Sequence, residues 1–342
     1  MNRKTFVQSS LTLLAAAGLP VSVVNAGTQP AETKEKIPPF LKPGDMIGIT
    51  SPAGFIMREG IIPAATLMQQ WGFKIRVGYT IGKRDFTFGG TDAERREDLQ
   101  QLLDDPAVKA IMCARGGYGS VRIVDGLNWD RFKANPKWLI GFSDITVLHS
   151  HINKNLGIAT LHSKMCNSFP DVWDTADPLQ KDTIESIRKA LTGEKMSYTA
   201  EAFNQLNKTG TATGALVGGN LKTLETLAGS ASDLDTDGKI LFVEDTGEYL
   251  YSIDRMFWNL KRTGKLDRLA GLIVGGMKIK QDPLDEQFGK NIYDIVLEKT
   301  KMYSYPVCFD FPVGHQINNY ALRCGMKHQL SVTTAGATLT SL

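Results

Sequence analysis

Three side chains of this 342-residue chain, Ser143, Glu244 and His315, have the types that hydrolysis through a covalent intermediate needs. A serine hydroxyl becomes a nucleophile when an imidazole accepts its proton, and a further acceptor must fix the tautomer of that imidazole. A carboxylate serves well as that acceptor. The three residues therefore predict acyl transfer, provided that the elements around them bring them together.

Ser143 lies where a buried strand is predicted to turn into a helix. Apolar residues 138–140 indicate a strand, Gly141 allows a tight turn, and residues 145–156 have helical spacing. The first N–H groups of such a helix face any anion beside the hydroxyl, which suits a nucleophile. A second interpretation stays open, because Ser before a helix is also a common N-cap. Ile145 replaces the second glycine of G-x-S-x-G, which disfavours an ordinary α/β-hydrolase elbow.

His315 is the histidine whose position best suits a catalytic base. It follows an apolar run and lies in a loop with a glycine before it, where functional side chains are common. His149 and His151 are two residues apart in the predicted helix, so they face different sides and do not form a paired metal site. His162 and His328 lie in or beside apolar segments, which favours structural roles.

Glu244 is predicted to end the strand 240–243, from which a carboxylate can reach a cleft. Asp245 and Glu248 are close rivals for the same role. A strand-end acid that faces solvent is the alternative interpretation for each of the three.

A glycine-rich loop, Arg115–Gly119, follows the predicted strand 107–113. The backbone N–H groups of Gly116 or Gly117, together with that of Asp144, are candidates for an oxyanion hole, in which one donor typically contributes roughly 10²- to 10³-fold in rate. A phosphate loop is the competing interpretation, but the third glycine of G-x-G-x-x-G is missing.

The elements that must position these residues alternate between strand and helix over residues 41–165, which predicts a doubly wound parallel sheet. Ligands bind at the carboxyl ends of such strands, so the glycine loop and Ser143 are expected to be neighbours. Residues 166–205 form a predicted connecting segment. Residues 206–342 predict a smaller, mixed and strand-rich C-terminal domain, which contributes Glu244 and His315.

The first residues predict an export signal. Arg3 and Lys4 precede a mostly apolar stretch, residues 11–24, which is too short to span a bilayer and is interrupted by Pro20. Small residues up to Ala26 suit cleavage, so residues 1–26 are predicted to be a signal peptide and residues 27–40 a linker. The mature chain is then expected in the periplasm, without a membrane span; the route is either general secretion or a degenerate twin-arginine pathway.

The composition of the chain bears on which kinds of partner and cofactor are expected. The net charge of +3 arises from 39 basic and 36 acidic residues without a basic block, so no nucleic acid is expected as a partner. The four cysteines, at positions 113, 166, 308 and 324, have no zinc spacing, and their pairing stays open. We expect neither a metal nor another cofactor.

Five motifs in order resemble the LD-carboxypeptidases, a serine-peptidase family that includes muramoyl-tetrapeptide carboxypeptidases and microcin C immunity peptidases. The motifs cover nearly all of the chain after residue 40 and are Arg115–Gly119, Gly141–Thr146, Gly218–Leu221, Val243–Asp245 and Phe311–His315. The resemblance implies a flavodoxin-like N-terminal domain, a C-terminal domain that supplies two catalytic residues, and a homodimer. It assigns Ser143 as nucleophile, His315 as base and Glu244 as its partner, and it places Gly117 and Asp144 at the oxyanion.

The resemblance also implies a substrate, a muropeptide in which an L-centre precedes a terminal D-alanine. The free carboxylate of that substrate requires a basic partner, for which Arg115 and Arg255 are candidates. Two alternatives remain: an amidase of the microcin immunity type that cleaves peptidyl or aminoacyl sulfamoyl-adenylates, and a non-catalytic periplasmic binding protein with two domains around a cleft.

Overall fold

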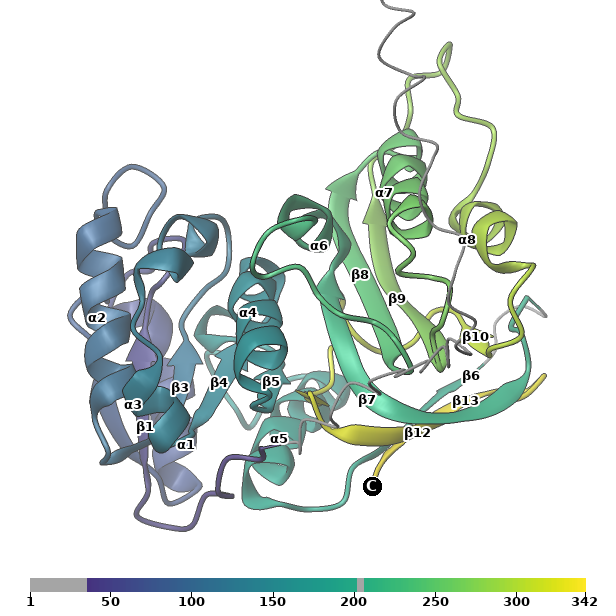
Figure 1. Ribbon diagram of the computed structural model, residues 1–342. Coiled ribbons are helices and arrows are strands. Elements are labelled where there is room, and N and C mark those ends of the chain that lie inside the picture. The colour runs from purple at the N-terminus through teal and green to yellow at the C-terminus, as the bar shows by residue number, and fades with distance from the viewer. Residues whose placement is uncertain (1–35, 202–205) are drawn as a thin grey trace, which may run out of the picture. The chain divides into compact units, whose positions relative to one another are not determined.

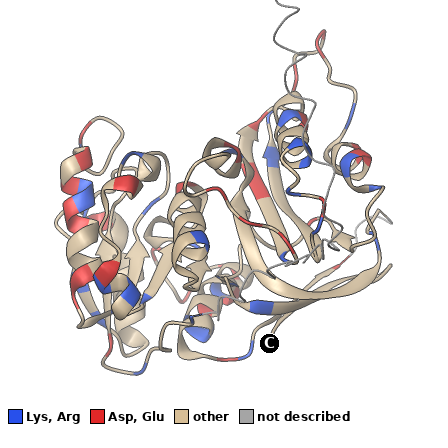
Figure 2. Ribbon diagram, in the orientation of Figure 1, with Lys and Arg blue, Asp and Glu red and all other residues tan. Residues whose placement is uncertain are grey.

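Figure 1 shows the computed structural model of the protein, which describes residues 36–201 and 206–342. The predicted signal peptide, residues 1–26, and most of the predicted linker, residues 27–40, lie outside the described residues. Charged residues of both signs are interspersed over helices and loops, and most strands carry few of them (Figure 2). No helix in the described ranges is both long and apolar enough to cross a bilayer.

The first sheet has six strands, five of them parallel, with β11 antiparallel at one edge. From the β2 edge, the parallel strands follow the order 2-1-3-4-5, the flavodoxin-like arrangement, so the predicted doubly wound α/β fold is confirmed. In that order they are β2 (Lys74–Val77), β1 (Met46–Thr50), β3 (Val108–Cys113), β4 (Trp138–Gly141) and β5 (Thr160–His162), followed by β11 (Leu322–Cys324).

Helices cover both faces of this sheet because its strands are apolar on both sides. One face packs against α2, α3 and α4, through side chains such as Leu99, Phe132 and Leu148. The other packs against α1 and α5, through Met68 and Ile187. The helices are α1 (Ile62–Gln70), α2 (Asp92–Asp104), α3 (Asp130–Ala134), α4 (Thr146–Leu156) and α5 (Pro178–Thr192).

The second sheet has seven strands and confirms the predicted strand-rich character of the C-terminal half. Strands β7 to β10 are parallel, whereas β12, β13 and β6 continue from β7 as antiparallel neighbours. In spatial order the strands are β10 (Val307–Cys308), β9 (Gly271–Ile279), β8 (Ile240–Glu248), β7 (Gly210–Asn220), β12 (Lys327–Val332), β13 (Gly336–Ser341) and β6 (Ser197–Glu201); the helices are α6 (Leu221–Leu227), α7 (Leu250–Arg262) and α8 (Ile292–Thr300).

Two strands cross the segment boundaries drawn from the sequence. β6 lies in the segment 166–205, which was expected only to connect, yet it pairs with β13 in the second sheet. β11 lies in the C-terminal segment, yet it pairs with β5 in the first sheet. Each of these two segments therefore contributes a strand to a sheet outside its own predicted boundaries. All four cysteines are buried and free.

Candidate active site

Ser143 occupies a strained turn between β4 and α4. Its φ is +62°, a left-handed conformation that non-glycine residues seldom adopt and that costs about 1–3 kcal/mol. It opens a short 3₁₀ turn, Ser143–Ile145, and α4 then begins at Thr146 without a side-chain capping bond. The N-cap interpretation is therefore wrong, because the hydroxyl does not cap α4. Such a turn holds a side chain out at the carboxyl edge of the sheet.

The glycine loop after β3 lies against Ser143. A Cβ at Gly116 would lie 3.3 Å from the Ser143 Oγ, and Gly117 has a φ of +104° that favours glycine. The Gly116 carbonyl accepts a hydrogen bond from the Gly54 N–H at 2.9 Å, which ties the loop to the one that follows β1. The glycine loop and Ser143 are therefore neighbours, as expected. The backbone of the loop approaches the Ser143 hydroxyl closely because Gly116 has no side chain.

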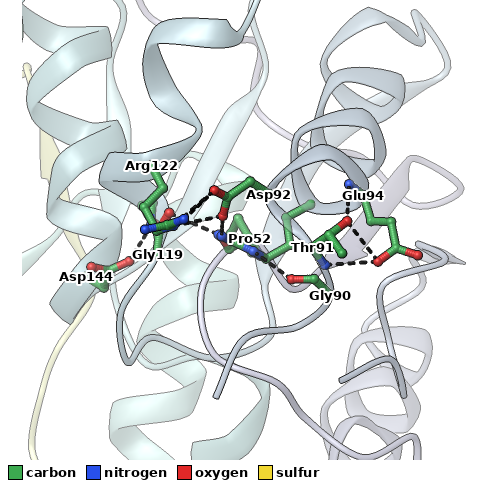
Figure 3. A network of polar contacts seen from close by, with 10 residues as sticks. Pro52, Gly90, Thr91, Asp92, Glu94, Gly119, Arg122 and Asp144 are labelled. Atoms are coloured by element: carbon green, nitrogen blue, oxygen red, sulfur yellow. Dashed lines mark hydrogen bonds and ion pairs between the residues drawn. The ribbon is translucent and has the colours of Figure 1, made fainter. Parts of the chain in front are cut away.

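The far end of the glycine loop is fixed from two directions (Figure 3). The Asp144 carboxylate accepts from the Ser120 N–H at 2.8 Å, and the guanidinium of buried Arg95 donates to the Gly119 carbonyl at 3.0 Å. Arg95 also donates to the carbonyl of Pro52, at 2.5 Å. Burial raises the pKa of Asp144, and the hydrogen bond from Ser120 opposes that rise. Asp144 therefore joins the serine turn to the glycine loop.

Glu244 and His315 form a direct pair, with 2.6 Å between the His315 Nδ1 and the Glu244 Oε2. Glu244 is fully buried, and the imidazole remains partly exposed. β8 does not end at Val243, as the sequence suggested, but continues to Glu248, with an irregular register against β9 at Glu244. Bulges of this kind often aim a side chain at an active site.

The same irregularity brings the His315 loop to β9. Gly276 pairs with Gly314, and the Gly276 N–H donates to the Val313 carbonyl at 2.9 Å. Beneath the loop, the Asn319 Oδ1 accepts from the Gly314 N–H at 2.7 Å and lies 3.2 Å from the Nε2 of buried His162. The backbone that carries the imidazole is thereby held on both sides.

Phe142 lies between Ser143 and this pair, since it precedes Ser143 in sequence and its ring centroid lies 4.9 Å from that of His315. Ser143 lines a cavity of about 250 Å³ together with Gly117 and Asp144, whereas His315 lines a neighbouring cavity of about 520 Å³. Thr246 lines both. Within the described ranges no hydrogen bond joins Ser143 to His315, and such bonds often tighten only around a substrate.

The two predicted carboxylate-binding arginines lie elsewhere. Arg115 donates to the Phe55 carbonyl at 3.1 Å and stacks over that residue's ring. Arg255 lies over the Tyr251 ring on α7. Neither side chain lines the cavity that holds His315.

The rivals of Glu244 have other partners. The Asp245 carboxylate accepts from the Asn220 side chain at 3.0 Å and from the Lys222 N–H at 2.8 Å, and burial raises its pKa to about 6. Glu248 accepts from the Ser252 hydroxyl at 2.5 Å. Asp245 thus holds the start of α6, and of the three acids Glu244 is the one that pairs with His315.

Several site residues were missed from the sequence. Lys164 and Lys278 line the His315 cavity, Thr246 lies between the two cavities, and Asn319 supports the His315 loop. Lys164 follows β5 at the carboxyl edge of the first sheet, a position that was available as a signal. In the described parts of the chain, no three or more His, Cys, Asp and Glu side chains gather as a metal site would require.

Comparisons with known proteins match the segments that form both sheets to the same family. Residues 47–163 match the LD-carboxypeptidase N-terminal domain, and residues 213–330 match the LD-carboxypeptidase C-terminal domain. A probable murein peptide carboxypeptidase of Bacillus subtilis is 31% identical over 88% of this chain and 93% of its own. The microcin C7 self-immunity protein MccF of Escherichia coli is 30% identical over 83% and 90%. The crystal structure of muramoyltetrapeptide carboxypeptidase from Oxalobacter formigenes superposes with a TM-score of 0.77 at 25% identity, over 86% of this chain and 98% of its own.

Proposed function

Because this chain belongs to the LD-carboxypeptidase family of serine peptidases, we propose that it releases terminal D-alanine from peptidoglycan muropeptides by Ser-His-Glu catalysis. The family makes the chain an enzyme and a peptidoglycan carboxypeptidase in the broad sense, which argues against a non-catalytic binding protein. The observation that carries the finer proposal is the hydrogen bond between Glu244 and His315, beside a serine in a strained turn.

In the proposed acylation, the Ser143 Oγ attacks the carbonyl carbon that links an L-centre, such as meso-diaminopimelate or lysine, to D-alanine. His315 accepts the hydroxyl proton, and Glu244 holds its imidazole in the required tautomer and stabilises the imidazolium. The N–H groups of Gly117 and Asp144 are proposed to stabilise the oxyanion.

Collapse of the tetrahedral intermediate breaks the C–N bond, and His315 gives its proton to the leaving nitrogen of D-alanine. Water, deprotonated by His315, then attacks the acyl ester, and the shortened peptide leaves with a new carboxylate. The scheme uses neither a metal nor a cofactor. Its peptide partner is a muropeptide or another small peptide.

The test is to incubate the purified protein with defined tri-, tetra- and pentapeptides and to follow released amino acids by mass spectrometry. We expect D-alanine from the tetrapeptide, and no release by the Ser143→Ala variant. A serine-reactive phosphonate should add to Ser143 in the wild type. Unimpaired release by Ser143→Ala would refute the assignment of the nucleophile.

A second candidate is an amidase that acts on aminoacyl sulfamoyl-adenylates. The size of the His315 cavity, about 520 Å³, favours it, because a leaving alanine occupies only a small part of that volume. The 30% identity to MccF points in the same direction. Competition between the tetrapeptide and an aminoacyl sulfamoyl-adenylate, measured as kcat/KM for each, decides between the two.

Export and dimerisation complete the proposal. Arg3, Lys4 and the apolar stretch 11–24 support cleavage after Ala26 and a periplasmic location. Intact-mass analysis of the secreted protein should give a chain that begins at Gly27. Light scattering of the purified protein should give twice the chain mass; a single-chain mass would exclude the homodimer.

A further inference from the structure

The cavity that holds His315 is bordered by two lysines from different sheets. Lys164 follows β5 of the first sheet and Lys278 lies near the end of β9 of the second. Asp177 also borders this cavity, and its carboxylate caps α5, where it accepts from the Leu179 N–H at 2.8 Å. Two lysines border the cavity against one aspartate, whose carboxylate already caps a helix, so the charge of the lining favours an anionic group.

Lys164 is half-buried beside the catalytic pair. Its Nζ donates to the Gln316 carbonyl at 2.6 Å, next to His315 in sequence. Burial lowers the pKa of Lys164, and the nearby charge of Glu244 opposes that fall. An ammonium group has three donors, so two remain beyond the bond to Gln316. Lys164 therefore brings positive charge close to the imidazole and is fixed in place.

Lys278 is exposed and its ammonium group has no hydrogen-bond or ion-pair partner among the residues that the structure describes. Its neighbour Lys280, just beyond β9, differs in that its ammonium lies over the Tyr249 ring, and it does not border the cavity. A lysine that lines a cavity without a protein partner is available to a ligand.

The chemistry of the site determines which part of a substrate reaches these lysines. In serine-peptidase catalysis the imidazolium protonates the leaving nitrogen, so the leaving amino acid lies on the side of His315. One Cα separates that nitrogen from the α-carboxylate of the leaving residue. The carboxylate is therefore expected in the cavity that His315 lines, and the acyl part beside Ser143 and Gly117 in the other cavity.

We propose that Lys278, assisted by Lys164, binds the α-carboxylate of the leaving amino acid and so makes the enzyme selective for a free C-terminus. This inference rests on the proposed function. It replaces the predicted roles of Arg115 and Arg255, which lie outside this cavity. A charged hydrogen bond to an otherwise unpaired ammonium gives preference for a carboxylate over an uncharged amide.

The test compares a tetrapeptide that ends in free D-alanine with the same peptide ending in D-alaninamide. kcat/KM is measured for the wild type, Lys278→Gln and the matched control Lys280→Gln. We expect the wild type to prefer the free carboxylate. In Lys278→Gln, kcat/KM for the free acid should fall about tenfold, mainly through KM, while the amide is affected far less. Lys280→Gln should keep the wild-type preference.

The possible outcomes are distinct. If Lys278→Gln keeps the wild-type ratio between acid and amide, the carboxylate site is wrong although the enzyme remains a carboxypeptidase. If Lys280→Gln lowers the ratio of kcat/KM between acid and amide as much as Lys278→Gln does, the loss of any positive charge nearby explains the effect, and the assignment to Lys278 also fails. If the wild type cleaves neither peptide, it is the proposed function that fails. Thermal unfolding of each variant verifies that all three proteins are folded.

Discussion

At the scale of single residues, the site is defined by a backbone conformation and a pair of side chains. Ser143 keeps φ at +62° because β4 and α4 fix the chain on either side of it. Glu244 is fully buried, and its Oε2 lies 2.6 Å from the His315 Nδ1. Both features fix the positions of the Ser143 backbone and of the Glu244–His315 pair in the protein without substrate.

The pair gives the first prediction. Glu244→Gln preserves the shape of the side chain but leaves His315 without a carboxylate, so kcat for D-alanine release should fall about 10⁴-fold with little change in KM. Steady-state kinetics on the tetrapeptide measure this. Glu248→Gln, which removes a carboxylate bonded to Ser252, is the control and should keep kcat within about tenfold of the wild type. Equal losses in both variants would contradict the role of Glu244.

The sequence was informative about single residues where the signal is local. Ser143 and His315 each follow an apolar run and lie beside a turn, which is a pattern visible in a short window. Arg95 was not recognised, because an arginine in a strongly polar helix usually faces solvent. Its burial depends on the loops that contain Pro52 and Gly119, which are 43 and 24 residues away in sequence. Lys278 was missed since only the fold places it beside His315.

At the scale of elements, α2 acts as the support of two loops at the site. From this helix Arg95 donates to the carbonyls of Pro52, Gly90 and Gly119. Figure 3 shows these three residues close to Asp92 and Arg122. The helix itself begins with a capping box, a pattern of Thr followed three residues later by Glu that is visible in the sequence, in which the Thr91 hydroxyl accepts from the Glu94 N–H at 3.2 Å. A local signal thus fixed the start of the helix.

The second prediction compares two arginines that both pair with Asp92. Arg95→Met leaves three carbonyls without their donor, so the free energy of unfolding should fall by about 3 kcal/mol, and kcat should fall as the glycine loop loosens. Arg122→Met removes an exposed ion pair and should change neither quantity measurably. Chemical denaturation and tetrapeptide kinetics test both variants. Equal stability of the two would show that Arg95 is not a support.

The loop that carries His315 gives the third prediction. Gly314 has a φ of +106°, and a Cβ there would lie 2.5 Å from the Glu244 Cβ. Gly314→Ala should therefore separate His315 from Glu244 and, if the proposed mechanism holds, reduce kcat at least about 100-fold. Gly289 has a φ of +77° with no atom within 4 Å of an added Cβ, so Gly289→Ala bears the backbone strain alone and should retain kcat. Retained activity in Gly314→Ala would contradict this account of the loop.

At the scale of the whole molecule, the first sheet was predictable because its central strands β1, β3 and β4 are mostly apolar and buried, and helices alternate with the strands along the chain. The pairing of β11 with the first sheet and of β6 with the second was not predictable. β11 has only three residues, too few for any period, and β6 alternates in a segment whose polar character indicated a linker.

Buried histidines make stability depend on pH. His328, in β12, and His149, in α4, are both buried, and burial lowers the pKa of each to about 4. An unfolded histidine titrates near 6.5 and binds a proton that the folded form excludes. The contribution of such a group is therefore fully present above pH 6.5 and is lost as the pH falls towards 4.

The fourth prediction isolates one of them. The fall in the free energy of unfolding between pH 7 and pH 5 should be about 2 kcal/mol smaller in His328→Gln than in the wild type, because one titrating group has been removed. Denaturant titrations at the two pH values measure the difference. Each protein is compared with itself at the two pH values, so a loss of packing in the variant does not affect the result. An equal fall in the free energy of unfolding in both proteins would show that His328 does not stay neutral in the folded state.

The position of β11 has a consequence for how the protein is made. The outer neighbour of β5 is β11, residues 322–324, so the first sheet is completed only long after its other five strands have been synthesised. A fragment that stops before this strand leaves the β5 edge unpaired and open to association with other chains. Removal of the last few dozen residues should therefore damage the half of the molecule that was translated first, and the serine turn with it.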